Sequence, residues 1–483
     1  MVQVLLILLF ASLHLFDGLG SHAALDLPSW QAVLLTTGPI VVMWGVFQLL
    51  CIYWGRQLDR KGRFEVVRTA DLAMLGLRLL AGAWWGFGVF ALGSLSASRR
   101  EIGDWVMVDE LLTLAPMLLF IAATWWSMYP LELRLREAVL MRELNDGSPV
   151  HAPLSRVQFV SSCVRHQAML FLAPLTLMTT WQETMVMHVS PWMVRTWSED
   201  ALWLAPLVEY AGIIGVLVTC PAIIRRIWDT VEIGAGPLRD QMRAMCRQYG
   251  VRVRGPLLWR THGSMVNGAI LGVFWPLRYM LLSDALLERL TGEQVEAVMA
   301  HEVAHVRRRH LVWLAVCVVS SVLLLAVVVG GIIEGFNITA ISSSALSIIM
   351  GLLGIAGAGM VFGAVSRRFE WQADAFAVQH LSRIPAGGSS ESKGAVTAAS
   401  VQVMASALQS VADLNGIDPE GFTWRHGSVR ERQRRLGALI DRPLNALPID
   451  RQVRFIKVAA VAGIVISLVP MVMALLNVSG EGV

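Results

Sequence analysis

Charge and cysteine are both scarce in this chain. Charged residues make up only 16% of the 483 residues, while 55% are hydrophobic and the mean hydropathy is +0.57. A soluble protein of this length would carry more charge. The five cysteines form no close-spaced pair, which argues against a disulfide framework or a thiolate metal site. The net charge of +4 is small, and we expect no nucleic-acid partner.

Long apolar runs dominate the sequence instead. Several approach or exceed the roughly 20 residues that cross a bilayer as a helix. We therefore predict a multi-span membrane protein, in contact with membrane lipid, with about nine spans. The predicted spans are residues 2–16, 31–54, 72–96, 111–130, 168–187, 201–224, 311–333, 340–365 and 458–476. The first is short enough for a signal peptide but lacks a basic start, so an anchor suits it equally.

Basic residues alternate between the connecting segments. Residues 55–70 and 131–167 are rich in arginine, whereas the segments on the other side are poor in Lys and Arg. Because basic loops stay on the cytoplasmic side, counting spans places residues 225–310 and 366–457 there as well. We expect an integral multi-pass protein of a bacterial inner (plasma) membrane.

Two charged residues fall inside predicted spans, Arg78 in the third and Glu209 in the sixth. An intramembrane charge either faces a wet functional cavity or makes a structural polar contact within the bundle. The sequence leaves both alternatives open.

The most informative motif is His-Glu-x-x-His, formed by His301, Glu302 and His305. On a helix, residues four apart lie on one face, so both imidazoles can bind one metal ion while Glu302 points toward its bound water. Two histidines, an open coordination position and a carboxylate base are typical of zinc peptidases. A structural zinc site would have no use for such a base.

The surrounding residues predict the helix that carries this motif. Thr291 and Gln294 have the spacing of a capping box, so the helix is expected to begin near residue 292. It is expected to continue through His310 into the seventh span. On such a helix His310 points off the face of the motif, so it is not expected to be a fourth ligand.

A zinc site of this kind needs a third protein ligand. After the hairpin of two spans, Glu370 follows the apolar edge at Val365 by five residues, which returns it to the level of His305. Asp374, one turn further on, can reach the N–H of a ligating imidazole. Alone, the two carboxylates would be read as a solvated helix face. Beside the motif they predict a complete site for one zinc ion per chain.

Four blocks within residues 235–440 follow one another in a specific order. They are Asn267-Gly268-Ala269 with Pro276 to Asp284, the zinc motif, Glu370 with Asp374, and Arg425 to Arg432. This order resembles the membrane zinc metallopeptidases that include the HtpX heat-shock protease and the CAAX prenyl endopeptidases. One departure is Gly427-Ser428, where family members commonly have two prolines.

The resemblance implies further site residues. His426 and Arg432 would line the active site, with Arg432 among the substrate-binding residues and His426 donating to the oxyanion of a tetrahedral intermediate. Asn267 and Ala269 would belong to an edge strand that pairs with an extended substrate. Residues 383–393, rich in Gly and Ser, are expected to form a mobile loop beside the site.

The expected fold is mainly α: a polytopic membrane helical bundle with a cytoplasmic, gluzincin-like zinc peptidase domain that carries a small edge β-sheet. The expected parts are 1–230 (six-span region), 231–310 and 366–450 (the two halves of the peptidase domain), 311–365 (two-span hairpin) and 451–483 (last span and tail).

We predict an integral membrane zinc metalloendopeptidase that cleaves unfolded or membrane-associated proteins, with protein or peptide segments as its substrates. In this mechanism Glu302 takes a proton from the attacking water and passes it to the leaving amine. Two alternatives stay open. One is a dedicated processing peptidase for a single lipidated or membrane-anchored precursor, and the other is a non-catalytic zinc-binding transporter or sensor.

Overall fold

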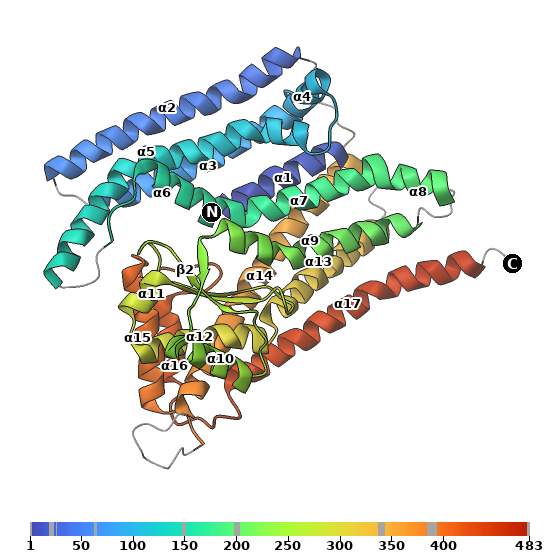
Figure 1. Ribbon diagram of the computed structural model, residues 1–483. Coiled ribbons are helices and arrows are strands. Elements are labelled where there is room, and N and C mark those ends of the chain that lie inside the picture. Colours follow the sequence, from blue (N-terminus) through green and yellow to red (C-terminus); the bar gives the residue numbers. More distant parts are fainter. Residues whose placement is uncertain are drawn as a thin grey trace. The chain divides into compact units, whose positions relative to one another are not determined.

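The computed structural model describes residues 2–18, 24–25, 27–61, 65–146, 151–197, 203–336, 343–383 and 394–480. Within these ranges the chain is mainly helical and contains a four-stranded sheet (Figure 1). It divides into two compact units, Met1–Trp228 and Asp229–Val483. The loop expected at residues 383–393 lies outside the described residues except for Arg383.

Seven helices among the described residues are long and apolar enough to cross a membrane. They are Ser29–Arg60, Glu65–Phe90, Val108–Ala138, Ala205–Ile227, His310–Gly335, Ile349–Ser382 and Pro448–Pro470. This confirms the predicted multi-span helical architecture, although the predicted count of nine is not confirmed. The first predicted span is the shorter apolar helix α1 (Val2–Gly18). The fifth is α7 (Met169–Thr184), which passes into π-helical turns at both ends.

Among the described residues, the secondary-structure elements of the first unit are all helices. Its remaining helices are α2 (Ser29–Lys61), α3 (Glu65–Phe90), α4 (Ser94–Ile102), α5 (Val108–Asp146), α6 (Arg156–Cys163), α8 (Ser190–Trp197) and α9 (Ala205–Ile227). Apolar side chains such as Leu6, Phe16 and Trp85 form its core.

Both intramembrane charges of this unit have partners inside it. Arg78 donates to the Thr124 hydroxyl at 2.7 Å and to the Ile121 carbonyl at 3.2 Å, and its guanidinium lies 4.7 Å from the centre of the Trp125 ring. Gln182 donates to a Glu209 carboxylate oxygen at 3.2 Å. These contacts favour the structural alternative for Arg78, because its Nε and Nη2 donate to residues of the neighbouring helix α5.

The second unit combines a small sheet with helices. It contains β1 (Thr230–Glu232), α10 (Pro237–Gln248), β2 (Pro256–Trp259), β3 (Gly268–Leu271), β4 (Tyr279–Ser283), α11 (Asp284–Arg289), α12 (Gly292–Arg307), α13 (His310–Gly335), α14 (Ser343–Ser382), α15 (Ala398–Leu414), α16 (Val429–Gly437) and α17 (Pro448–Gly480). The strand order is β1-β2-β4-β3, with β2 and β4 parallel and the other pairs antiparallel. The strand β3 is therefore an edge strand, as the sequence predicted.

Helix α12 contacts the sheet through β3 and also contacts α14. Alanines on both helices are fully buried, namely Ala297, Ala300 and Ala304 on α12 and Ala373 and Ala377 on α14. Small side chains let two helix axes approach closely, which brings the polar residues of one helix within reach of those on the other. Figure 1 shows α13, α14 and α17 as the long helices of this unit.

The helix that carries the zinc motif begins as predicted but does not continue into the span. The Thr291 and Gln294 side chains form the capping box that starts α12 at Gly292. The helix ends at Arg307, and Arg309 has a left-handed backbone conformation with φ of 55°. The expectation of one continuous helix was wrong, because a left-handed residue interrupts the helical hydrogen bonds and α13 starts afresh at His310.

Candidate active site

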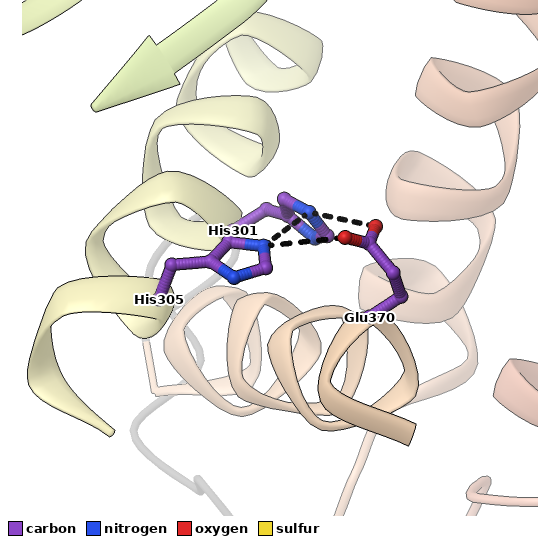
Figure 2. Close-up of side chains that lie close together, drawn as sticks. All are labelled: His301, His305 and Glu370. Atoms are coloured by element: carbon purple, nitrogen blue, oxygen red, sulfur yellow. Dashed lines mark hydrogen bonds and ion pairs between the residues drawn. The ribbon is translucent and has the colours of Figure 1, made fainter. Parts of the chain in front are cut away.

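Three side chains from two helices converge in the second unit (Figure 2). His301 and His305 come from α12, and Glu370 comes from α14. The two Nε2 atoms lie 3.2 Å apart. Glu370 Oε2 lies 3.6 Å from His301 Nε2, and Glu370 Oε1 lies 3.7 Å from His305 Nε2. Among the described residues this is the group of His, Cys, Asp and Glu that could hold a metal ion.

The geometry of these atoms fits a small tetrahedral ion. Zinc–nitrogen and zinc–oxygen bonds of about 2.0–2.1 Å place neighbouring ligand atoms about 3.3 Å apart. The three observed separations are close to that value. Two imidazoles and one carboxylate are also a donor set that zinc accepts. His301 and Glu370 are buried, so their ligand atoms have given up contact with bulk water.

Asp374 and Arg432 form a buried ion-pair network with His301 and Glu370. His301 Nδ1 lies 2.9 Å from Asp374 Oδ1. Arg432 donates to both oxygens of Asp374, at 2.8 and 2.6 Å, and its Nη2 lies 3.5 Å from Glu370 Oε2. Asp374 thus lies next to the Nδ1 side of the His301 imidazole. Arg432 therefore contacts both carboxylates, Asp374 and Glu370.

Burial and neighbouring charges shift the pKa values of the three motif residues in different directions. Burial opposes the charged form of His301, but Asp374 and Glu370 outweigh it and raise its pKa to about 10. Burial lowers the pKa of His305 to about 4. Burial also raises the pKa of Glu302 to about 7, a range suited to a group that accepts and returns a proton near neutrality.

The edge strand β3 lies directly against Glu302. A Cβ atom at Gly268 would lie 2.9 Å from Val298 Cγ1 and 3.5 Å from Glu302 Cγ. The backbone N–H of Ile270 donates to the Glu302 carboxylate and favours its charged form. Glycine at position 268 therefore permits the close approach of strand and helix.

The register of β3 shows which backbone groups face outward. The Asn267 carbonyl accepts from the Ser283 N–H at 2.9 Å, and Ala269 is paired with Leu281. In an antiparallel ladder the pairing alternates, so Gly268 and Ile270 turn their backbone groups away from β4. Sequence reasoning named Asn267 and Ala269 but missed these two residues, because the alternation is known only once the register is known.

His426 reaches the site on a short loop. Its Nδ1 lies 3.1 Å from Glu370 Oε1, and its side chain is 46% exposed. Thr423 and Gly427 pair across the loop, with Gly427 N–H donating to the Thr423 carbonyl at 2.9 Å. Gly427 has φ of 75°, a conformation that proline cannot adopt, so this chain turns the loop by a different backbone route from two prolines.

The same loop is fastened to α14 by an aromatic contact. Trp424 stacks on Phe362 with ring centres 5.1 Å apart, and Arg367 donates to the Trp424 carbonyl at 2.9 Å. Ser428 then caps α16 by accepting from the Glu431 N–H at 3.2 Å. The contacts of Trp424 before His426 and the helix cap at Ser428 after it therefore fix both ends of the loop.

His310 contacts the site although the sequence placed it off the motif's face. Its Nδ1 lies 3.0 Å from His305 Nδ1. Two residues five apart on an unbroken helix are about 140° apart around the axis and cannot meet in this way. The break at Arg309 is what brings them together, and the sequence carried no glycine or proline that would have signalled it.

Comparisons with known proteins agree with the site. Residues 237–410 match the model of peptidase family M48. The crystal structure of S. mikatae Ste24p is similar to this chain with a TM-score of 0.46 and 14% sequence identity, covering 85% of this chain and 100% of that one. No curated protein sequence matches. The match to the family M48 model covers three of the four sequence blocks, including the zinc motif, Glu370 and Asp374, and it confirms the resemblance to this family; the fourth block, Arg425 to Arg432, lies outside the matched residues. Residues 237–410 of this membrane protein are a peptidase family M48 domain.

Proposed function

We propose that this protein is an integral membrane zinc metalloendopeptidase that cleaves unfolded or membrane-associated proteins at the cytoplasmic face. The observation that carries the proposal is the convergence of His301, His305 and Glu370 beside Glu302 and an edge strand. A metal-binding cluster of purely structural use would not need a carboxylate such as Glu302 next to it. The match to peptidase family M48 and the apolar helices support the more general assignment as a membrane metallopeptidase.

His301, His305 and Glu370 would hold the zinc ion, which would supply Lewis-acid polarisation of the scissile carbonyl and a water of lowered pKa. Asp374 keeps the His301 ring oriented, and Arg432 keeps Asp374 in place. Glu302 takes a proton from the attacking water and delivers it to the leaving amine. Ile270 N–H, which faces the carboxylate, keeps Glu302 oriented between these transfers.

Substrate would bind as an additional strand on β3. The outward backbone groups of Gly268 and the outward carbonyl of Ile270 can pair with an extended main chain, which gives affinity with little sequence preference. Such pairing requires an unfolded segment, so folded proteins would be poor substrates. His426, whose half-exposed side chain lies beside Glu370, would donate to the oxyanion that develops during attack.

The cytoplasmic location of the site is supported by the distribution of basic residues. The segments on the same side as the motif, 55–70 and 131–167, carry the arginine-rich loops. A cysteine placed in segment 55–70 and labelled with a membrane-impermeant reagent in intact cells tests this orientation. Protection in intact cells and labelling after permeabilisation is the expected result, and labelling in intact cells would overturn it.

The function itself is tested with purified, zinc-loaded protein and an unfolded protein substrate. The wild-type chain should cleave it, whereas Glu302→Gln should bind zinc equally and cleave at least about 10³-fold more slowly, since it lacks the proton acceptor. Equal cleavage by both would contradict the role of Glu302. If the wild type binds zinc stoichiometrically but cleaves no unfolded or membrane-anchored peptide, the endopeptidase proposal fails.

A further inference from the structure

His310 is a buried histidine next to a proposed metal ligand, and the peptidase mechanism above does not use it. It is 2% exposed, and its ring stacks on Phe369 with ring centres 4.5 Å apart and planes 7° apart. Its two nitrogens have different partners, His305 Nδ1 at 3.0 Å and Gln372 Oε1 at 2.9 Å. A buried histidine with both nitrogens engaged is held in one orientation.

The chain of contacts continues to the last helix. Gln372 donates through Nε2 to Asp450 Oδ1 at 2.6 Å. Asp450 lies in the first turn of α17, and Arg308 lies 3.5 Å from the same oxygen. Four side chains from α12, α13, α14 and α17 therefore form one continuous row of polar contacts that ends at His305.

The directions of these hydrogen bonds follow from the far end of the row. A carboxylate can only accept, so the amide nitrogen of Gln372 faces Asp450 and its oxygen faces His310. That oxygen can only accept, so His310 carries its proton on Nε2. With the ring neutral, His310 Nδ1 is a lone pair, and the proton between the two rings belongs to His305 Nδ1.

The consequence falls on the metal-facing atom of His305. An imidazole protonated on Nδ1 presents a lone pair at Nε2, the atom that lies 3.2 Å from His301 Nε2. If the row ran in the opposite direction, His305 would carry its proton on Nε2 and could not bind an ion with that atom. The other ligating histidine faces a carboxylate instead, at Asp374.

We propose that His310, oriented by Gln372 and Asp450, is a positioning residue that holds His305 in the tautomer and orientation needed for zinc. This inference rests on the metal site of the proposed function. His310 and Asp450 would thus affect the affinity for zinc rather than contact the substrate.

The test uses a matched pair of substitutions in the full-length protein. His310→Asn places an amide oxygen about where Nδ1 lies, so it can still accept from His305. His310→Leu has nearly the same shape but cannot accept, and both lose the ring that stacks on Phe369. Zinc dissociation constants are measured by competition with a chelator of known affinity, and thermal midpoints of the zinc-free forms are measured alongside.

We expect His310→Leu to bind zinc about 10–100-fold more weakly than the wild type, the usual cost of losing a partner of a ligating histidine. His310→Asn should retain most of the affinity, with similar zinc-free midpoints for both variants. Equal affinity of His310→Leu and the wild type would overturn the inference. Equal weakening by both variants would also overturn it, because the ring would then act through packing alone.

A second variant covers the case in which His310→Leu does not fold. Gln372→Met removes the acceptor of His310 Nε2 while keeping the side-chain length, so the direction of the row is no longer imposed. Its zinc affinity should fall, and an unchanged affinity would contradict the row. A wild-type protein that binds no zinc would instead reject the proposed function itself, which keeps the two failures distinct.

Discussion

Arg432 binds Asp374 through two hydrogen bonds of 2.8 and 2.6 Å in a place where both side chains are buried. The pair joins α16 to α14 directly behind His301. A buried charge pair contributes little net stability, but removing Arg432 would leave the buried Asp374 carboxylate with His301 as its remaining charged partner. The geometry of the site therefore depends on a contact between α16 and α14.

Replacing Arg432 by alanine should lower the free energy of unfolding of the peptidase unit by about 3–5 kcal/mol, the usual cost of removing one partner of a buried ion pair. Arg430→Ala is the matched control on the same helix. Its side chain is 57% exposed, so its effect should stay within about 0.5 kcal/mol. Denaturation of the detergent-solubilised proteins provides the comparison. Similar losses for the two variants would show that Asp374 does not depend on Arg432.

His426→Leu should lower kcat by about 10²–10³-fold, the effect of removing a hydrogen-bond donor to a developing oxyanion. Zinc content and the thermal midpoint should change little, because the side chain is half exposed and lies on a loop fastened elsewhere by Trp424. Steady-state kinetics on an unfolded substrate separates kcat from KM. A change confined to KM would mean that His426 only helps to bind the substrate.

Gly268→Ala should reduce kcat/KM by about 10-fold or more, since a misplacement of about 1 Å at an active site can cost about 10²-fold. The added methyl group would lie 2.9 Å from Val298 Cγ1 and would force β3 away from Glu302. Gly255→Ala is the control, because nothing lies within 4 Å of a Cβ there. Zinc binding should be normal in both variants. Unchanged kinetics in Gly268→Ala would show that β3 can shift without harm.

Asp284 should contribute stability that depends on pH. Burial disfavours its charge, but hydrogen bonds from the Thr261 hydroxyl and the N–H groups of Ala285, Thr261 and His262 outweigh this and lower its pKa. A carboxylate with a lowered folded-state pKa contributes its full stability above the unfolded-state value of about 3.9 and loses it as pH falls through the folded-state value.

The corresponding measurement compares wild type and Asp284→Asn across pH. The variant should be less stable at pH 7, and the difference should shrink steadily below about pH 4 as the wild-type carboxylate is protonated. Thermal midpoints between pH 3 and 7 follow this change. A constant difference between the two proteins over that range would show that the hydrogen bonds do not depend on the charge of Asp284.

Much of this architecture could be predicted from local patterns. The spacing of His301 and His305, the capping box at Thr291 and the return of Glu370 after a two-span hairpin all depend on helix geometry, which is constant. Runs of apolar residues predicted the membrane helices for the same reason. The predicted count of nine spans is not confirmed, because the first and fifth predicted spans form the shorter helices α1, of 17 residues, and α7, of 16 residues.

What the sequence by itself determined was the chemistry that the chain can present: two imidazoles and a base on one helix face, with carboxylates one hairpin later. Only the tertiary structure decided how those groups are held. The pairing of Arg432 with Asp374 and the outward turn of Gly268 and Ile270 depend on packing and register between distant segments. The approach of His310 to His305 depends on a left-handed residue at Arg309. Local propensity carries no signal for such contacts, because their free energy exists only after the elements have packed together.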